Sequence, residues 1–227
     1  MSEPHHSVLD PRITRGLIAR LRLTRLLGRF PERPVWTAFM FINGFITIAM
    51  LAALAMVTRT TFVFPSLGPT AFLFFFTPTL PAASPRNTLL GHAIGIACGY
   101  GALLLLGLEH APPAMTVGVD LDRVLAAALS LAATGSLMIL FKAAHPPAGA
   151  TTLIISLGIV TRPSYLVVIE VAVALLTLQA FAINRLAGID YPLWASKVAP
   201  RPAPPPGVVV HPSSVVDPGA PRRDEVA

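Results

Sequence analysis

The chain has 227 residues, of which 54% are hydrophobic and only 12% are charged, so it carries more apolar surface than one small soluble core can bury. Its formal net charge of +6 is concentrated at the two ends rather than on a folded basic face, which argues against nucleic acid as a partner. The apolar residues form long uninterrupted runs, and a bilayer core takes about 20 helical residues to cross. We therefore expect an integral membrane protein with lipid around it.

Residues 1–34 form a basic N-terminal arm. The arm is rich in arginine and has few acidic residues, so the positive-inside bias places it in the cytoplasm. Arginines alternate with Ile and Leu over Ile13 to Phe30, which predicts either an amphipathic helix on the inner leaflet or a solvated basic segment. The arginines are Arg12, Arg15, Arg20, Arg22, Arg25, Arg29 and Arg33.

Residues 35–194 form the expected transmembrane domain, with four apolar runs long enough to be full helical spans. The first run is too long for a signal peptide and has no small-residue cleavage site. Cys98, the only cysteine, lies inside the second run and can form neither an intrachain disulfide nor a cysteine-based zinc site. The four runs are Val35–Val57, Leu89–Leu108, Val124–Phe141 and Tyr165–Leu186.

Two further apolar segments, Phe62–Thr77 and His145–Val160, are interrupted by proline and glycine. FPSLGPTA in the first aligns with HPPAGATT in the second at an offset of 81 positions (146 minus 65), so that proline, glycine and threonine coincide. Each segment lies between two spans, which predicts an internal repeat over about residues 35–108 and 124–187. Paired broken segments of this kind point to the binding site of a transporter.

The charges of the loops favour six crossings over four, namely four full spans plus two short broken helices. The loop from Glu109 to Asp122 is acidic and has no basic residue, so it reads as external if the N-terminal arm is internal. That assignment requires the first broken segment to cross the membrane, and it makes the two repeats antiparallel. We therefore predict an all-α polytopic fold built from inverted repeats.

The prolines of the broken segments predict helices that begin inside the membrane. Free N–H groups and the positive end of the dipole at such a start favour an anion, and two starts facing each other would form one central site. The alternative is that proline and glycine only kink helices for close packing. The helix-breaking residues are Pro65, Pro69, Pro146 and Pro147. The candidate substrate-binding residues are Ser66, Gly68, Thr70, His92, His145, Gly149, Ala150 and Thr151.

Other polar or small residues in the spans have more than one interpretation. Gly91, Gly95 and Gly99 share one helical face, which favours close packing. Glu170 needs a partner or a proton inside the membrane, and His92 and Arg162 are the candidates. An intramembrane metalloenzyme using His92, His145 and Glu170 is the competing class. The two histidines lack the close helical spacing of the usual metal-binding motif. We therefore expect that the protein is not an enzyme and has no catalytic residue, metal or cofactor.

The motifs HPPAGATTLI, FPSLGPTA and PRNTLLGH together resemble the HPP family of integral membrane proteins, over about Arg33 to Leu193. The resemblance implies a small bundle usually described with four transmembrane helices. Plant members are associated with nitrite transport in the chloroplast envelope. Some members carry C-terminal CBS domains, whereas residues 195–227 here are rich in proline and predict a disordered cytoplasmic tail.

These observations favour a transporter or channel for a small inorganic anion, with nitrite or nitrate as the first candidates. The alternative is a non-transporting membrane scaffold or regulatory partner protein. The content of alanine, arginine and proline suits a multi-pass protein of a bacterial inner membrane, with both termini in the cytoplasm. A bundle this small also suits a homodimer.

Overall fold

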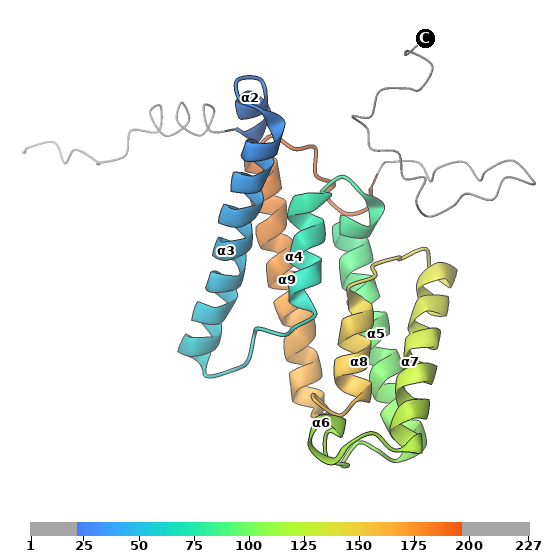
Figure 1. Cartoon of the computed structure of the whole chain (residues 1–227). Coiled ribbons are helices and arrows are strands. Elements are labelled where there is room, and N and C mark those ends of the chain that lie inside the picture. Colours follow the sequence, from blue (N-terminus) through green and yellow to red (C-terminus); the bar gives the residue numbers. More distant parts are fainter. Residues whose placement is uncertain (1–21, 197–227) are drawn as a thin grey trace, which may run out of the picture.

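The structure, a computed structural model, describes residues 22–196, and all regular secondary structure within that range is helical. Four helices are long and apolar enough to cross a membrane, and shorter helices connect or accompany them (Figure 1). The elements are α2 (Leu23–Leu27), α3 (Glu32–Thr58), α4 (Leu67–Phe76), the 3-10 turn η1 (Pro81–Ala83), α5 (Pro85–Leu106), α6 (Ala114–Val117), α7 (Leu121–Leu140), α8 (Ala148–Ser156) and α9 (Pro163–Leu186).

The four predicted spans correspond to α3, α5, α7 and α9, which confirms the polytopic all-α fold. Local sequence explains where several of them begin and end. Pro85 and Pro163 occupy the first turns of α5 and α9, where a missing N–H costs nothing. Asp120 caps α7 by accepting from the N–H of Arg123, and Gly107 ends α5 in the left-handed region.

The predicted amphipathic helix over residues 13–30 lies mostly outside the described residues. Within the described part, only Leu23–Leu27 is helical, as the short α2. The proposed disordered tail also falls outside the described range, except for residues 195 and 196.

The two broken segments form short helices that begin in the middle of the bundle (Figure 1). α4 runs from there toward the end where α2 lies, and α8 runs toward the end where α6 lies. Their first residues, Leu67 and Ala148, are 81 positions apart (148 minus 67), which is the offset found in the sequence. Each helix in the series α3, α4, α5, α7, α8, α9 runs opposite to the one before it, as six crossings require.

Three of the four prolines precede the helical residues, and Pro69 lies in the first turn of α4. Ser66 is the N-cap of α4, so Pro65 precedes the cap and Pro69 is the third helical residue. Pro147 is itself the N-cap of α8, and Pro146 precedes it. Proline still determines the start, because its fixed φ and missing N–H prevent the helix from extending backward.

The two repeats exchange their last helices. α5 belongs to the first repeat by sequence, yet it packs most extensively on α7 and α8 of the second. α9 belongs to the second repeat and packs on α3 and α4 of the first, as well as on α5. Neither half therefore completes its own packing, and each short helix packs on one long helix of its own repeat and one of the other.

A stripe of glycines allows α5 and α8 to approach closely. A Cβ on Gly95 would lie 2.8 Å from the carbonyl oxygen of Ala148, and one on Gly99 would lie 2.9 Å from that of Thr152. A Cβ on Gly91 would lie 2.6 Å from the Cβ of His145. The stripe therefore serves packing, the role that small residues commonly have between membrane helices.

Two arginines connect the ends of helices through hydrogen bonds to backbone carbonyls. The guanidinium of Arg123 is almost fully buried and donates to the carbonyls of Ser156, Ala111 and Pro112. At the opposite end of the bundle, Arg86 donates to the carbonyls of Phe141 and Lys142, at the C-terminus of α7. Both contacts satisfy carbonyls that a helix end or a loop otherwise leaves without a partner.

Replacement of Gly95 by alanine tests the contact between α5 and α8. We expect Gly95→Ala to lower the free energy of unfolding by about 1–3 kcal/mol, because the added Cβ meets backbone atoms that cannot move aside. Gly101→Ala on the same helix is the control, since its Cβ meets no atom within 4 Å. Thermal unfolding of the two variants in detergent measures the difference, and equal stabilities would contradict this account of the packing.

Candidate functional site

One histidine joins the starts of the two short helices. Thr70 is the fourth residue of α4 and Thr151 the fourth of α8, so the two threonines are equivalent in the repeat. His92 of α5 lies between them. Its Nε2 is 3.0 Å from the hydroxyl of Thr70, and its Nδ1 is 2.8 Å from the hydroxyl of Thr151. Equivalent threonines of the two repeats are thus hydrogen-bonded to the same imidazole ring.

A second histidine, His145, completes the cluster from the loop before α8. Its Nε2 is 3.2 Å from the hydroxyl of Thr70, and its Nδ1 is 2.7 Å from the carbonyl oxygen of Ala82 in η1. The two imidazole rings are 5.0 Å apart between centroids. Both histidines and both threonines are fully buried. We call His92, His145, Thr70 and Thr151 the histidine cluster.

The start of α4 keeps polar groups without partners. The hydroxyl of Ser66 is buried and makes no hydrogen bond, although Ser66 is the N-cap. No backbone carbonyl among the described residues accepts from the N–H of Gly68, and a Cβ there would meet nothing within 4 Å. A buried polar group normally has a partner, so this start is the part of the site best suited to a ligand.

The start of α8 is closed by contrast. The N–H groups of Ala148, Gly149 and Ala150 donate to the carbonyls of His145, Pro146 and Pro147 in tight turns. Gly149 faces α7, since a Cβ on it would lie 3.3 Å from a methyl of Leu131. The two helix starts therefore meet at His92 but are not equivalent, and the expected symmetric pair of open donors is not formed.

An apolar groove of about 930 Å³ runs beside the histidine cluster. It lies between α4 and the start of α8, and the loop through η1 contributes to its wall. Ala150 therefore faces the groove rather than the cluster. The lining residues include Pro69, Phe72, Phe76, Ala82, Pro146 and Ala150.

Two polar residues near the cluster were not anticipated from the sequence. Thr88 lies one turn before His92 on α5, and its hydroxyl is 3.4 Å from Nδ1 of His145. The hydroxyl of Thr134 on α7 is 2.9 Å from that of Thr152. The four-residue spacing of Thr88 and His92 is the signal that would have identified the first, because such residues share a helical face.

Glu170 does not join the cluster, which corrects the pairing expected for it. His92 uses both ring nitrogens on the two threonines, and one carboxylate oxygen of Glu170 is buried without a hydrogen-bond partner. Arg162 lines a different hollow, described below. Within residues 22–196, no three histidine, cysteine, aspartate or glutamate side chains converge to hold a metal ion.

Comparison with known proteins places this arrangement in a family. The family described as "HPP, transmembrane region" matches residues 31–192. The chain belongs to this family. The matched range covers all four long helices together with α4, α8 and every residue of the histidine cluster.

Two curated relatives of this HPP family member are transmembrane proteins of Dictyostelium discoideum. One is 32% identical over 155 residues, which is 65% of this chain and 47% of the relative. The other is 26% identical over 165 residues, 70% of this chain and 54% of the relative. The chain thus spans about half the length of the curated relatives it matches. No solved structure matches it significantly.

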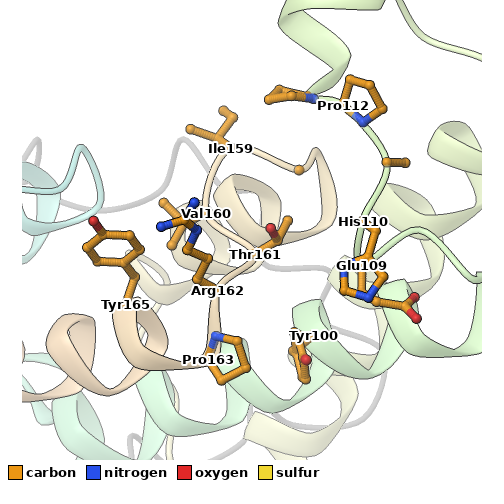
Figure 2. Close-up of a pocket in the computed structure, with 13 residues that line it drawn as sticks. Tyr100, Glu109, His110, Pro112, Ile159, Val160, Thr161, Arg162, Pro163 and Tyr165 are labelled. Carbon is orange, nitrogen blue, oxygen red and sulfur yellow. The ribbon is translucent and has the colours of Figure 1, made fainter.

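A separate hollow of about 550 Å³ lies at the α6 end of this HPP domain (Figure 2). Its walls come from the loop after α5 and from the loop between α8 and α9. Arg162 and Tyr165 line one side, and Glu109 and His110 line the other (Figure 2). A larger share of its lining is polar than in the groove beside α4, and no residue of the histidine cluster lines it.

The hydroxyl of Thr70 is the shared partner of both histidines, so its removal tests the cluster. We expect Thr70→Val to lower the free energy of unfolding by about 1–3 kcal/mol, because two buried ring nitrogens lose their partner. Thr177→Val is the control, since that buried hydroxyl bonds only to a carbonyl of its own helix. Thermal unfolding in detergent measures both, and an equal effect would contradict the shared role of Thr70.

Proposed function

We propose that the protein moves a small inorganic anion across the membrane, with the start of α4 as its binding site. The observation that carries the proposal is the pair of unsatisfied donors at Ser66 and Gly68, next to two buried histidines. Non-helical backbone at membrane depth is tolerated only where it is buried in protein or faces a wet cavity. A transported ligand explains why these groups are kept.

The chemistry of this site favours negative charge. A helix start presents N–H donors and the positive end of the helix dipole. Ser66 and Thr70 add hydroxyls, and neither α4 nor α8 contains a carboxylate. Of the candidate residues from the sequence, we therefore assign Ser66, Gly68 and Thr70 to direct contact with the anion. His92 and His145 support this site through Thr70, and Gly149 and Ala150 are left out of it.

Nitrite and nitrate are the substrates we propose first. Both are small planar oxyanions whose oxygens accept several hydrogen bonds, which suits donors spread over one helical turn. The resemblance to plant members associated with nitrite transport agrees with this choice. The curated relatives matched here are named only as transmembrane proteins, so the substrate rests on the chemistry of the site and on that resemblance.

We propose that both termini lie in the cytoplasm of a bacterial cell whose inner membrane holds the protein. The α2 end of the bundle holds α2, the starts of α3 and α5 and the ends of α7 and α9 (Figure 1). The described charges on or next to these segments are mostly basic: Arg22, Arg25, Arg29, Glu32, Arg33, Arg86, Lys142, Arg185 and Asp190. The opposite end holds the end of α3, the loop after α5 and the starts of α7 and α9 (Figure 1), whose charges are balanced: Arg59, Glu109, Asp120, Asp122, Arg123 and Arg162. The positive-inside bias therefore supports a cytoplasmic α2 end.

Flux of nitrate into proteoliposomes tests the proposal. We expect purified protein to give more flux than empty vesicles. We expect Gly68→Asp to lower the flux by about tenfold or more, the effect of roughly 1.4 kcal/mol of repulsion against the anion. Gly68→Asn is the matched control, because it has the same shape without the charge.

The results separate transport from the alternative of a non-transporting scaffold. If the protein gives no flux above empty vesicles for nitrate, nitrite and other small anions, the scaffold is the better account. If Gly68→Asp and Gly68→Asn transport equally well, an anion site at the start of α4 is wrong even if the protein transports.

A further inference from the structure

The hydrogen bond from His145 to Ala82 fixes the orientation of protons in the histidine cluster. A carbonyl oxygen only accepts, so Nδ1 of His145 must carry a proton and donate to it over 2.7 Å. When the ring is neutral, its Nε2 therefore has no proton and can only accept. The nearest donor to that Nε2 is the hydroxyl of Thr70, at 3.2 Å.

The remaining bonds follow from this first one. The hydroxyl of Thr70 has a single proton, so when it donates to His145 it can only accept from His92. Nε2 of His92 must then carry a proton, and its Nδ1 accepts from the hydroxyl of Thr151. When Thr70 donates to His145, the four side chains form one directional chain, from Thr151 through His92 and Thr70 to His145, that ends at the backbone carbonyl of Ala82.

Thr70 has a second acceptor within reach, the carbonyl oxygen of Ser66 at 3.1 Å. If Nε2 of His145 gains a proton, that nitrogen becomes a donor to the hydroxyl oxygen of Thr70. The hydroxyl proton of Thr70 can then no longer point at Nε2, and it points at the carbonyl oxygen of Ser66 instead. Ser66 is the residue whose own hydroxyl is buried without a partner at the start of α4. Protonation of His145 would therefore turn the Thr70 hydroxyl toward the backbone carbonyl of Ser66, the residue that caps α4.

Among the described residues, the surroundings of His145 offer no negative charge to balance a bound proton. His92 on α5 is the titratable side chain beside it, and it is occupied by the two threonines. α4, α8 and η1 contain no titratable residue, and those of α7, Asp122 and Arg123, lie in its first turn at the far end. Arg86 is engaged with carbonyls at the end of α7. An anion at the start of α4 would supply the missing negative charge.

We propose that His145 binds one proton for each anion bound at the start of α4, so that the protein carries the two together. This proposal rests on the anion transport proposed above. A hydronium ion gives its proton to the lone pair of Nε2 and leaves as water, the hydrogen bond from Thr70 to Nε2 breaks, and one from Thr70 to the carbonyl of Ser66 forms. Release of the proton reverses each change, and the loaded site carries no net charge.

Two physical arguments support this coupling. A lone charge in the membrane is costly, and a charge paired at close range is much less so, which favours carrying the anion as part of a neutral pair. Coupling between two ligands is also reciprocal, so a proton that strengthens anion binding is itself bound more tightly when the anion is present.

Transport in proteoliposomes tests the coupling directly. We expect nitrate entry to acidify the lumen, reported by a trapped pH-sensitive dye, with one proton for each nitrate. An inward proton gradient of about one pH unit should accumulate nitrate roughly tenfold at one proton per anion. His145→Gln keeps a hydrogen-bonding side chain but cannot take up a proton, so we expect it to lose this accumulation. His110→Gln, at the α6 end, should keep it.

A spectroscopic measurement tests the proton chain without relying on flux. In protein labelled with nitrogen-15 histidine and held in nanodiscs, neutral His145 should carry its proton on Nδ1 and neutral His92 on Nε2. Added nitrate should convert His145 to the doubly protonated form. The His92→Gln and His145→Gln variants assign the two signals.

The outcomes distinguish the two proposals. Nitrate flux without proton uptake would overturn the coupling and leave anion transport standing, whereas the absence of any anion flux would overturn transport and the coupling with it. A proton on Nδ1 of His92, or a His145 that stays neutral in saturating nitrate, would overturn the proton chain itself.

Discussion

A helix that begins inside a bilayer must find partners for its first N–H groups, and the rest of this structure depends on that constraint. Water cannot satisfy these groups in hydrocarbon, so protein must surround them. α8 meets the requirement with tight turns to the carbonyls of His145, Pro146 and Pro147. α4 meets it only in part, and its unsatisfied donors at Ser66 and Gly68 distinguish it as the end open to a ligand.

The exchange of helices between the repeats explains how one residue serves both halves. α5 is covalently part of the first repeat but packs against α8, so His92 lies where it reaches Thr151 as well as Thr70. A cluster built in this way couples the two halves, because movement of either short helix changes a hydrogen bond to the same imidazole. Close approach through Gly91, Gly95 and Gly99 keeps these bonds short.

Two sets of polar side chains among the described residues differ in what they bond to. Arg123, Arg86 and Asn184 donate to carbonyls near helix ends and loops, which is a structural task. Outside the membrane core, the hydroxyl of Tyr191 donates to the carbonyl of Ala83, and burial raises its pKa well above the ordinary value. The histidine cluster differs because its members bond mainly to one another, so a change of proton at one site changes the others.

The sequence by itself determined the class of protein, the four long spans, the two short helices and the repeat that relates them. These features follow from local properties: the length of apolar runs, the fixed φ of Pro65 and Pro146, and the recurrence of a motif at a constant offset. It also named Ser66, Thr70, His92, His145 and Thr151 as polar residues of interest. All five lie at or beside one cluster in the folded chain.

The tertiary structure alone decided which residues meet and which helix start remains open. The carbonyl of Ala82 and the hydroxyl of Thr88 reach His145 across more than 50 residues of sequence, and no local pattern encodes such a contact. The turn bonds that close α8, and the direction in which Gly149 faces, likewise depend on how α7 and α5 pack around it. The exchange gives α4 and α8 equivalent partners, α3 and α9 for one and α7 and α5 for the other, but α8 packs much more extensively on α5 than α4 does on α9. This difference in packing distinguishes two helices whose sequence motifs align.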